Sequence, residues 1–220
     1  MLSTDKWKQI QTTLGITSDG VPGSGTADAV AARLGIAWAT GEIAGPAKPA
    51  PGSEPEWMVE ARRHIGLDEI PGPRHHPKIL SWWEKIKAPF RDDETPWCAA
   101  FVGGCLETVG VRSTRSAAAR SYSTSPDFRR LSQAAQGCVV VFWRGSPAGW
   151  SGHVAFLAGM TASGDLWCLG GNQGDEVSLA KFSPGRLIGF YWPQATNLDP
   201  KFFPVRRHSG AVGNFSQNEV

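Results

Sequence analysis

Residues 92–111 read DDETPWCAAFVGGCLETVGV and combine a helix start with an apolar helical face. Thr95 is a residue type that caps helix N-termini, and Pro96 suits the first helical position because proline has no N–H to leave unpaired. Apolar residues follow at helical spacing over the rest of the stretch. The sequence therefore predicts a helix with Thr95 as its N-cap, which puts Cys98 in the first turn.

The spacing of apolar residues changes after residue 137 to the period of two that is typical of β-strands. Gly, Pro and Ser turns separate five such segments. These are GCVVVFWR (137–144), HVAFLAGM (153–160), DLWCLGGN (165–172), EVSLAKF (176–182) and RLIGFYW (186–192). Amphipathic stretches at 56–67 and 78–90 predict further helices upstream. Helices followed by antiparallel strands predict an α+β fold, with the Cys98 helix packed on a sheet of about five strands.

Length and composition place the chain among globular proteins. Its 220 residues and 23.6 kDa leave room for one domain of ordinary size and a small appendage. Hydrophobic residues make up 41% and charged residues 19%, which favours a packed core and excludes a wholly disordered chain. The net charge of +2 comes without a basic block. Nucleic acid, which binds through dense phosphate neutralisation, is therefore not an expected partner.

No stretch of the sequence predicts insertion into a membrane or export by a signal peptide. No apolar run approaches the roughly 18 residues that a membrane-spanning helix needs. The opening residues MLSTDKWKQI lack the apolar stretch of a signal peptide. We therefore expect a protein made in the cytoplasm, with no membrane insertion.

Residues 5–36 predict two short helices around a turn. The turn, residues 19–26, reads DGVPGSGT and is rich in residue types that favour turns. This pattern resembles a peptidoglycan-binding repeat made of a helix, a DGxxGxxT loop and a second helix, with a plain helical hairpin as the alternative. Residues 37–55 are rich in Ala, Pro and Gly, a composition that stays extended and predicts a linker.

These observations divide the chain into four parts. Residues 1–36 form the small helical module, 37–55 the linker and 56–195 the main domain. Residues 196–220 form a tail that we expect to be flexible, unless its Phe-Phe-Pro segment docks on the domain.

The four cysteines are Cys98, Cys105, Cys138 and Cys168, with neither CxxC spacing nor the partner histidines of a zinc site. A metal site or a disulfide framework is therefore not expected. A thiol attacks as its thiolate, which the positive end of a helix N-terminus stabilises. Cys98 has that placement, whereas the other three lie deeper in the helix or inside apolar strands. Cys98 is the candidate nucleophile.

A cysteine nucleophile needs a base within hydrogen-bond reach and a third group that orients the base. His153 opens an apolar strand after a glycine, where a strand end can reach a helix terminus. In an antiparallel hairpin of the next two strands, Asn172 lies beside His153 and its amide oxygen can accept the imidazole N–H. Gln173 and Asp175 are the alternatives for this third position.

Residues 57–193 resemble the papain-like cell-wall peptidases of the NlpC and CHAP kind, most closely a subgroup found in phage endolysins. The segments that carry the resemblance, in the family's order, are EARRHIGLDEIPGPRHHPKIL, DDETPWCAAFVGGCLETVG, SAAARSY, GCVVVFWRG, SGHVAFLAG, LGGNQGDEV and RLIGFYWP. The resemblance implies a papain-like fold with Cys98 as nucleophile, His153 as base and Asn172 as the polar third residue. Typical members have Asp-Cys-Ser at the nucleophile, where this chain has Trp-Cys-Ala, so their substrate details do not carry over.

The resemblance implies a peptidoglycan hydrolase that cuts an amide bond by a Cys-His-Asn mechanism without a metal or other cofactor. Amidase and endopeptidase action both remain open. Trp97, Trp143, Trp150 and Gln173 flank the motifs and are the candidate substrate-binding residues. The ten tryptophans of the chain suit a sugar-facing cleft, but filling a small core is the more ordinary explanation.

Peptidoglycan is the expected partner, held by the N-terminal module of a monomeric enzyme that acts on the cell wall after its release from the cytoplasm. One alternative function is a non-catalytic cell-wall-binding or virion structural protein. The other is a papain-like peptidase or acyltransferase that acts on a different substrate, because fold alone does not decide function.

Overall fold

The computed structural model describes residues 3–15, 18, 26 and 53–208. The chain divides into two compact units, residues 1–47 and 48–220. The predicted second helix and most of the predicted linker fall within residues 27–52 and so lie outside the described residues. Among the helices that are described, none has both the length and the apolar character needed to cross a membrane.

The first unit contains helix α1 (Thr4–Leu14), as predicted from its apolar spacing. Ser3 caps its N-terminus by accepting a hydrogen bond from the Lys6 N–H. Gly15 ends the helix in the left-handed conformation that glycine adopts without strain. The Gln11 side chain donates to the Thr26 hydroxyl over 3.1 Å, and this buried bond ties α1 to the residue that ends the predicted turn.

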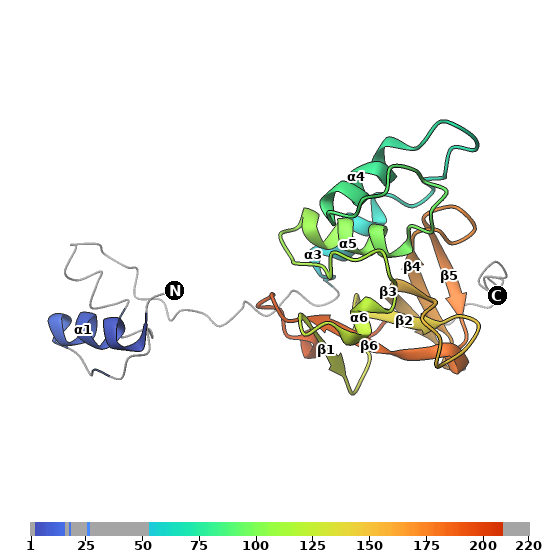
Figure 1. Ribbon diagram of the computed structural model, residues 1–220. Helices are drawn as coiled ribbons and strands as arrows, with labels where there is room; N and C mark the ends of the chain where they lie inside the picture. Colours follow the sequence, from blue (N-terminus) through green and yellow to red (C-terminus); the bar gives the residue numbers. More distant parts are fainter. Residues whose placement is uncertain (1–2, 16–17, 19–25, 27–52, 209–220) are drawn as a thin grey trace. The chain divides into compact units, whose positions relative to one another are not determined.

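The second unit is built on one sheet that contains all five predicted strands and two further ones (Figure 1). Its order is β1-β6-β2-β3-β4-β5, with neighbours antiparallel, and the short β7 pairs with β3 in parallel. The strands are β1 (Phe128–Leu131), β2 (Val139–Trp143), β3 (Gly152–Thr161), β4 (Leu166–Gly170), β5 (Ser178–Phe182), β6 (Leu187–Pro193) and β7 (Arg207–His208).

Helices α3, α4 and α5 gather on one side of this sheet, and α5 packs against β3 and β4 (Figure 1). The predicted α+β class, with the Cys98 helix on an antiparallel sheet, is therefore confirmed. The helical segments are α3 (Glu56–Arg62), α4 (Pro77–Lys85), α5 (Cys98–Thr108), α6 (Ser121–Thr124), and the 3₁₀ turns η1 (Pro184–Arg186) and η2 (Pro200–Phe202).

Helices α4 and α5 approach each other closely because α5 carries a glycine at the contact. A Cβ atom on Gly104 would lie 2.6 Å from Cγ of Trp82, which is too short for real carbon atoms. The indole of Trp82 also stacks on that of Trp97, with ring centroids 5.8 Å apart. This packing fixes the residue that immediately precedes Cys98.

Most of the described tryptophans fill the core, which is the ordinary explanation of their abundance. The tryptophan side chains that are almost wholly buried are Trp57, Trp82, Trp83, Trp97 and Trp192. The Trp57 indole N–H also donates to the carbonyl of Gly137 over 2.8 Å, so this buried polar group is satisfied.

Both ends of the second unit differ from the predicted boundaries. Glu54, assigned to the linker, accepts hydrogen bonds from Arg62 and from Gln136 and lies 3.2 Å from a guanidinium nitrogen of Arg206. The predicted flexible tail packs on the domain as far as residue 208, because Phe203 is buried in the core and β7 pairs with β3. Over residues 196–208 the docked alternative is the observed one, and the rest of the predicted tail lies outside the described residues.

Candidate active site

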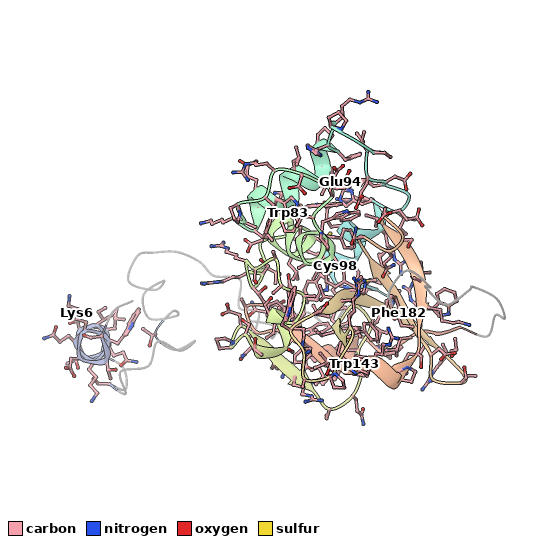
Figure 2. The ribbon with its side chains drawn as sticks, turned by 45° about the vertical axis from the view of Figure 1, so that its right-hand side comes forward. Lys6, Trp83, Glu94, Cys98, Trp143 and Phe182 are labelled. Carbon is pink, nitrogen blue, oxygen red and sulfur yellow. The ribbon has the colours of Figure 1, made fainter. Side chains whose placement is uncertain are left out.

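Cys98 is the first residue of α5 and lies where the helices meet the sheet, as Figure 2 shows. The N-cap residue of α5 is Trp97, whose side chain makes no hydrogen bond to the first N–H groups of the helix. The predicted N-cap, Thr95, is wrong: its N–H bonds the Asp92 carboxylate over 2.6 Å in a turn ahead of the helix. The first N–H groups of the helix therefore have no side-chain cap, and the helix dipole favours negative charge at Cys98.

His153 is fully buried near the start of β3, opposite Phe142 of β2. Its imidazole stacks on the ring of Phe182, with centroids 5.4 Å apart and planes at 14°. The imidazole also lies beside the Cys98 thiol, close enough to interact with it and to lower its pKa. The structure thus brings together the two residues that the sequence predicts as nucleophile and base.

The environment of Cys98 favours its ionised form in spite of burial. Burial alone raises the pKa of the thiol, whose residue is only 5% exposed. The hydrogen bond and charge of His153 act in the opposite direction, together with the charge of Arg144 and a hydrogen bond with the Val154 backbone. The net pKa of Cys98 lies below its ordinary value.

Two of the other buried cysteines, Cys105 and Cys138, do not share this environment. Burial raises the pKa of Cys105 well above its ordinary value, and it raises the pKa of Cys138 to about 12. Both thiols are therefore protonated at neutral pH, and a protonated thiol is a poor nucleophile. Of Cys98, Cys105 and Cys138, Cys98 is the one whose surroundings favour a nucleophilic thiolate.

The amide that contacts His153 belongs to Gln173, whereas the sequence favoured Asn172. Oε1 of Gln173 lies 3.2 Å from Nε2 of the imidazole, and the amide nitrogen of Gln173 donates to the Ser178 carbonyl over 2.7 Å. The Asn172 amide instead donates to Glu69 Oε1 over 2.8 Å. Gln173, which the sequence also suggested as a substrate contact, thus takes the place expected for Asn172.

The shift from Asn172 to Gln173 has a cause in the backbone. Phe156 pairs with Leu169 in the β3–β4 ladder, so continued pairing would set Asn172 opposite His153. Strand β4 ends at Gly170, however, and Asn172 adopts a left-handed φ of 56°. The turn breaks the alternation of side chains, and the following residue faces the imidazole.

Glu69 joins the nucleophile helix to the Asn172 turn, and sequence reasoning did not single it out. Its carboxylate accepts hydrogen bonds from the Trp97 indole over 2.6 Å and from Asn172. Burial, followed by the neighbouring negative charge of Asp175, raises the pKa of Glu69 against the effect of the Trp97 bond. A depression of about 510 Å³, lined by residues 63–70 and His76, lies beside it.

Arg144 is a second residue of the site that sequence reasoning did not single out. It directly follows β2, and its Nη2 lies 3.5 Å from Nδ1 of His153. Its only signal in the sequence was its place in the segment GCVVVFWRG, where it reads as an ordinary hairpin residue.

The three tryptophans predicted to contact substrate have different environments. Trp97 is fully buried, which differs from the cleft surface expected for it. Trp143 is half-buried, with the Arg186 guanidinium 5.6 Å from its ring centroid. Trp150 is 86% exposed in the loop between β2 and β3. Among the three, Trp150 presents the largest free aromatic surface.

Within residues 53–208 the site combines a thiol of lowered pKa, an imidazole and an amide oxygen that orients the imidazole. This set can form and break a thioester, because a thiolate attacks a carbonyl and an imidazolium can protonate a leaving group. Among the described residues, no group of three or more His, Cys, Asp or Glu side chains is placed to hold a metal ion.

A crystal structure of a Staphylococcus aureus protein, described as similar to a lipoprotein of the NLP/P60 family, matches this chain with a TM-score of 0.39 and 14% sequence identity. The match covers 86% of this chain and 61% of the other, so the chain spans less than two thirds of that protein's length. No protein-family model matches the sequence, and no curated protein matches it. The candidate function therefore rests on the residues of this site.

Proposed function

We propose that this protein is a cysteine hydrolase that cleaves an amide bond of peptidoglycan. The observation that carries the proposal is the placement of Cys98 at a helix N-terminus, beside the buried His153, whose imidazole lowers the pKa of the thiol. The imidazole is in turn oriented by the amide oxygen of Gln173. Nucleophile, base and orienting group are the three parts that a cysteine hydrolase needs.

The reaction proceeds through an acyl-enzyme. The Cys98 thiolate attacks the carbonyl carbon, and the oxyanion that forms is held by the Cys98 backbone N–H at the helix start. The His153 imidazolium protonates the leaving amine as the C–N bond breaks, which leaves a thioester on Cys98. The neutral imidazole then takes a proton from water, whose hydroxide attacks the thioester, and the acid product leaves as the thiolate re-forms.

Peptidoglycan as the substrate is supported by sequence features outside the three site residues. The motif order over residues 57–193 resembles cell-wall peptidases, including those of phage endolysins, and the loop at 19–26 resembles that of a peptidoglycan-binding repeat. A binding module joined by a linker raises the effective concentration of an enzyme on an insoluble substrate. The enzyme acts as a monomer on the wall after release from the cytoplasm.

Hydrolysis by Cys98 is tested with purified sacculi and two matched cysteine variants. Cys98→Ala should abolish the release of soluble fragments, whereas Cys138→Ala should retain the wild-type rate within about threefold, because a thiol that is protonated at neutral pH takes no part. Lysis that survives Cys98→Ala would refute the mechanism. Wild-type protein that sediments with sacculi and releases nothing would identify the non-catalytic binding protein instead.

The bond that is cut is read from the products. An amidase frees the first alanine of the stem peptide from muramic acid, whereas an endopeptidase leaves that bond intact and shortens or separates the peptides. Mass spectrometry of the released fragments distinguishes the two, and both agree with the proposed chemistry. Activity on unrelated peptides without any on sacculi would point to a peptidase of another substrate class.

A further inference from the structure

We propose that Arg144 is a positioning residue, which favours the Cys98 thiolate and the proton-accepting form of His153 and so sets the pH range in which the site works. Its role in turnover rests on the proposed cysteine mechanism. Its effect on the thiol is a property of the folded protein and is measurable without any substrate.

The hydrogen bonds around His153 define which ring nitrogen accepts a proton. The Gln173 amide nitrogen donates to the Ser178 carbonyl, which leaves the amide oxygen facing Nε2 of the imidazole. Because an amide oxygen only accepts, Nε2 carries the proton in the neutral ring. The other nitrogen, Nδ1, then has a lone pair, and that lone pair is what takes up the thiol proton.

Arg144 faces the nitrogen that accepts the proton. Its Nη2 lies 3.5 Å from Nδ1, and a guanidinium can only donate, so the contact suits an unprotonated Nδ1. The positive charge of Arg144 also favours the Cys98 thiolate. The same charge opposes an imidazolium, because two cations repel each other at this distance. Arg144 therefore acts on both members of the pair, favouring the anion on one and opposing the cation on the other.

The other ionisable groups that face the thiol do not substitute for this charge. Tyr122 of α6 lies near Cys98, but burial raises its pKa and the phenol stays neutral. Glu69, in the loop between α3 and α4, is not among the groups that act on the thiol, and its carboxylate accepts hydrogen bonds from the Trp97 indole and the Asn172 amide. From β3, the groups that act on the Cys98 thiol are His153 itself and the backbone of Val154.

The segment that carries Arg144 is held in place from both sides. Its own N–H bonds the Ser151 carbonyl over 3.1 Å and closes the β2–β3 loop. Arg120 reaches into this loop and donates to the carbonyls of Pro147 and Gly149, the former over 2.8 Å. A side chain anchored at such a loop base presents its charge at a fixed position, as a positioning role requires.

The experiment measures the rate at which iodoacetamide alkylates Cys98 in the full-length protein as a function of pH, with the site resolved by peptide mass spectrometry. Arg144→Gln should move the midpoint of this profile to higher pH by about one unit, and Arg144→Lys should recover at least half of the shift. The matched control is Arg129→Gln, which removes the same charge from the exposed face of β1 and should leave the midpoint unchanged.

Activity on sacculi gives the second readout. Loss of Arg144 favours both the thiol and the imidazolium, so both limbs of the pH–rate profile should move to higher pH, whereas a merely structural loss lowers the rate without moving the limbs. An unchanged alkylation midpoint in folded Arg144→Gln, or a shift that Arg144→Lys does not reduce, would overturn the inference. If the wild type releases no fragments but the midpoint still shifts, the proposed function fails and the effect of Arg144 on the thiol stands.

Discussion

Replacement of Gln173 by alanine tests how the imidazole is held. The change removes the oxygen that lies 3.2 Å from Nε2 of His153 and leaves a buried N–H without that acceptor. A hydrogen bond to a charged group contributes about 1.5–3 kcal/mol, and the imidazolium carries charge in the reactive ion pair. Since about 1.4 kcal/mol corresponds to a factor of ten, we expect the hydrolytic rate to fall about 10-fold to 150-fold.

The matched control for Gln173→Ala is Asn172→Gly. Glycine adopts the left-handed φ of 56° at this position without strain, and the change removes only the bond to Glu69. Gln173 keeps its bonds to Ser178, so the imidazole stays oriented. We therefore expect Asn172→Gly to retain activity within about threefold and to lose mainly stability, by about 1 kcal/mol.

The assay compares initial rates of fragment release from labelled sacculi at substrate levels far below saturation. Thermal unfolding of each variant checks that the protein is folded, and Cys98 alkylation at fixed pH reports the ion pair without turnover. If Asn172→Gly costs as much activity as Gln173→Ala, Asn172 orients the base and the assignment to Gln173 is refuted.

Two further predictions concern stability. Burial raises the pKa of Asp93, but hydrogen bonds from the backbone of Ile70 and His76 and from the His75 imidazole outweigh burial and lower that pKa. The ionised carboxylate therefore stabilises the fold at neutral pH, and this stabilisation is lost on acidification. Asp93→Asn should lower the free energy of unfolding, measured by urea denaturation at pH 7, by about 3 kcal/mol. The difference in unfolding free energy between variant and wild type should shrink below about pH 4, and a difference independent of pH would contradict this. Gly104→Ala should lower stability by about 3 kcal/mol because its Cβ overlaps Trp82, whereas Gly185→Ala, whose Cβ meets only a side-chain oxygen 3.6 Å away, should change it by less than about 0.5 kcal/mol in the same assay.

The predicted strands were found because apolar segments bounded by Gly, Pro and Ser turns are visible in the sequence, and three of them, β2, β3 and β4, are largely buried. Strand β1 lacks this signal: it reads FRRL, with both central arginines exposed, and pairs with β6 through its backbone. Strand β7 has two residues and joins β3 only because the tail docks. Short strands whose pairing is set by tertiary contacts leave little trace in local sequence.

Cys98 and His153 were predictable because local signals mark them, namely a helix start and a strand start next to glycine. Glu69 carries no such signal, since its partner Asn172 lies 103 positions away in the sequence. The contact of Arg144 likewise depends on how β2 and β3 pair. Gln173 was missed as the first choice because the ladder register, extended past the end of β4, points to its neighbour.

The ion pair between Glu54 and Arg206 has a consequence for how other modules can be joined to the second unit. It brings the first and last described segments of the second unit within 3.2 Å of each other. A module joined directly at residue 53 or at residue 208 would therefore be tethered at nearly the same point of the surface. New ends opened elsewhere in the second unit by circular permutation would need only a short connection between residues 54 and 206.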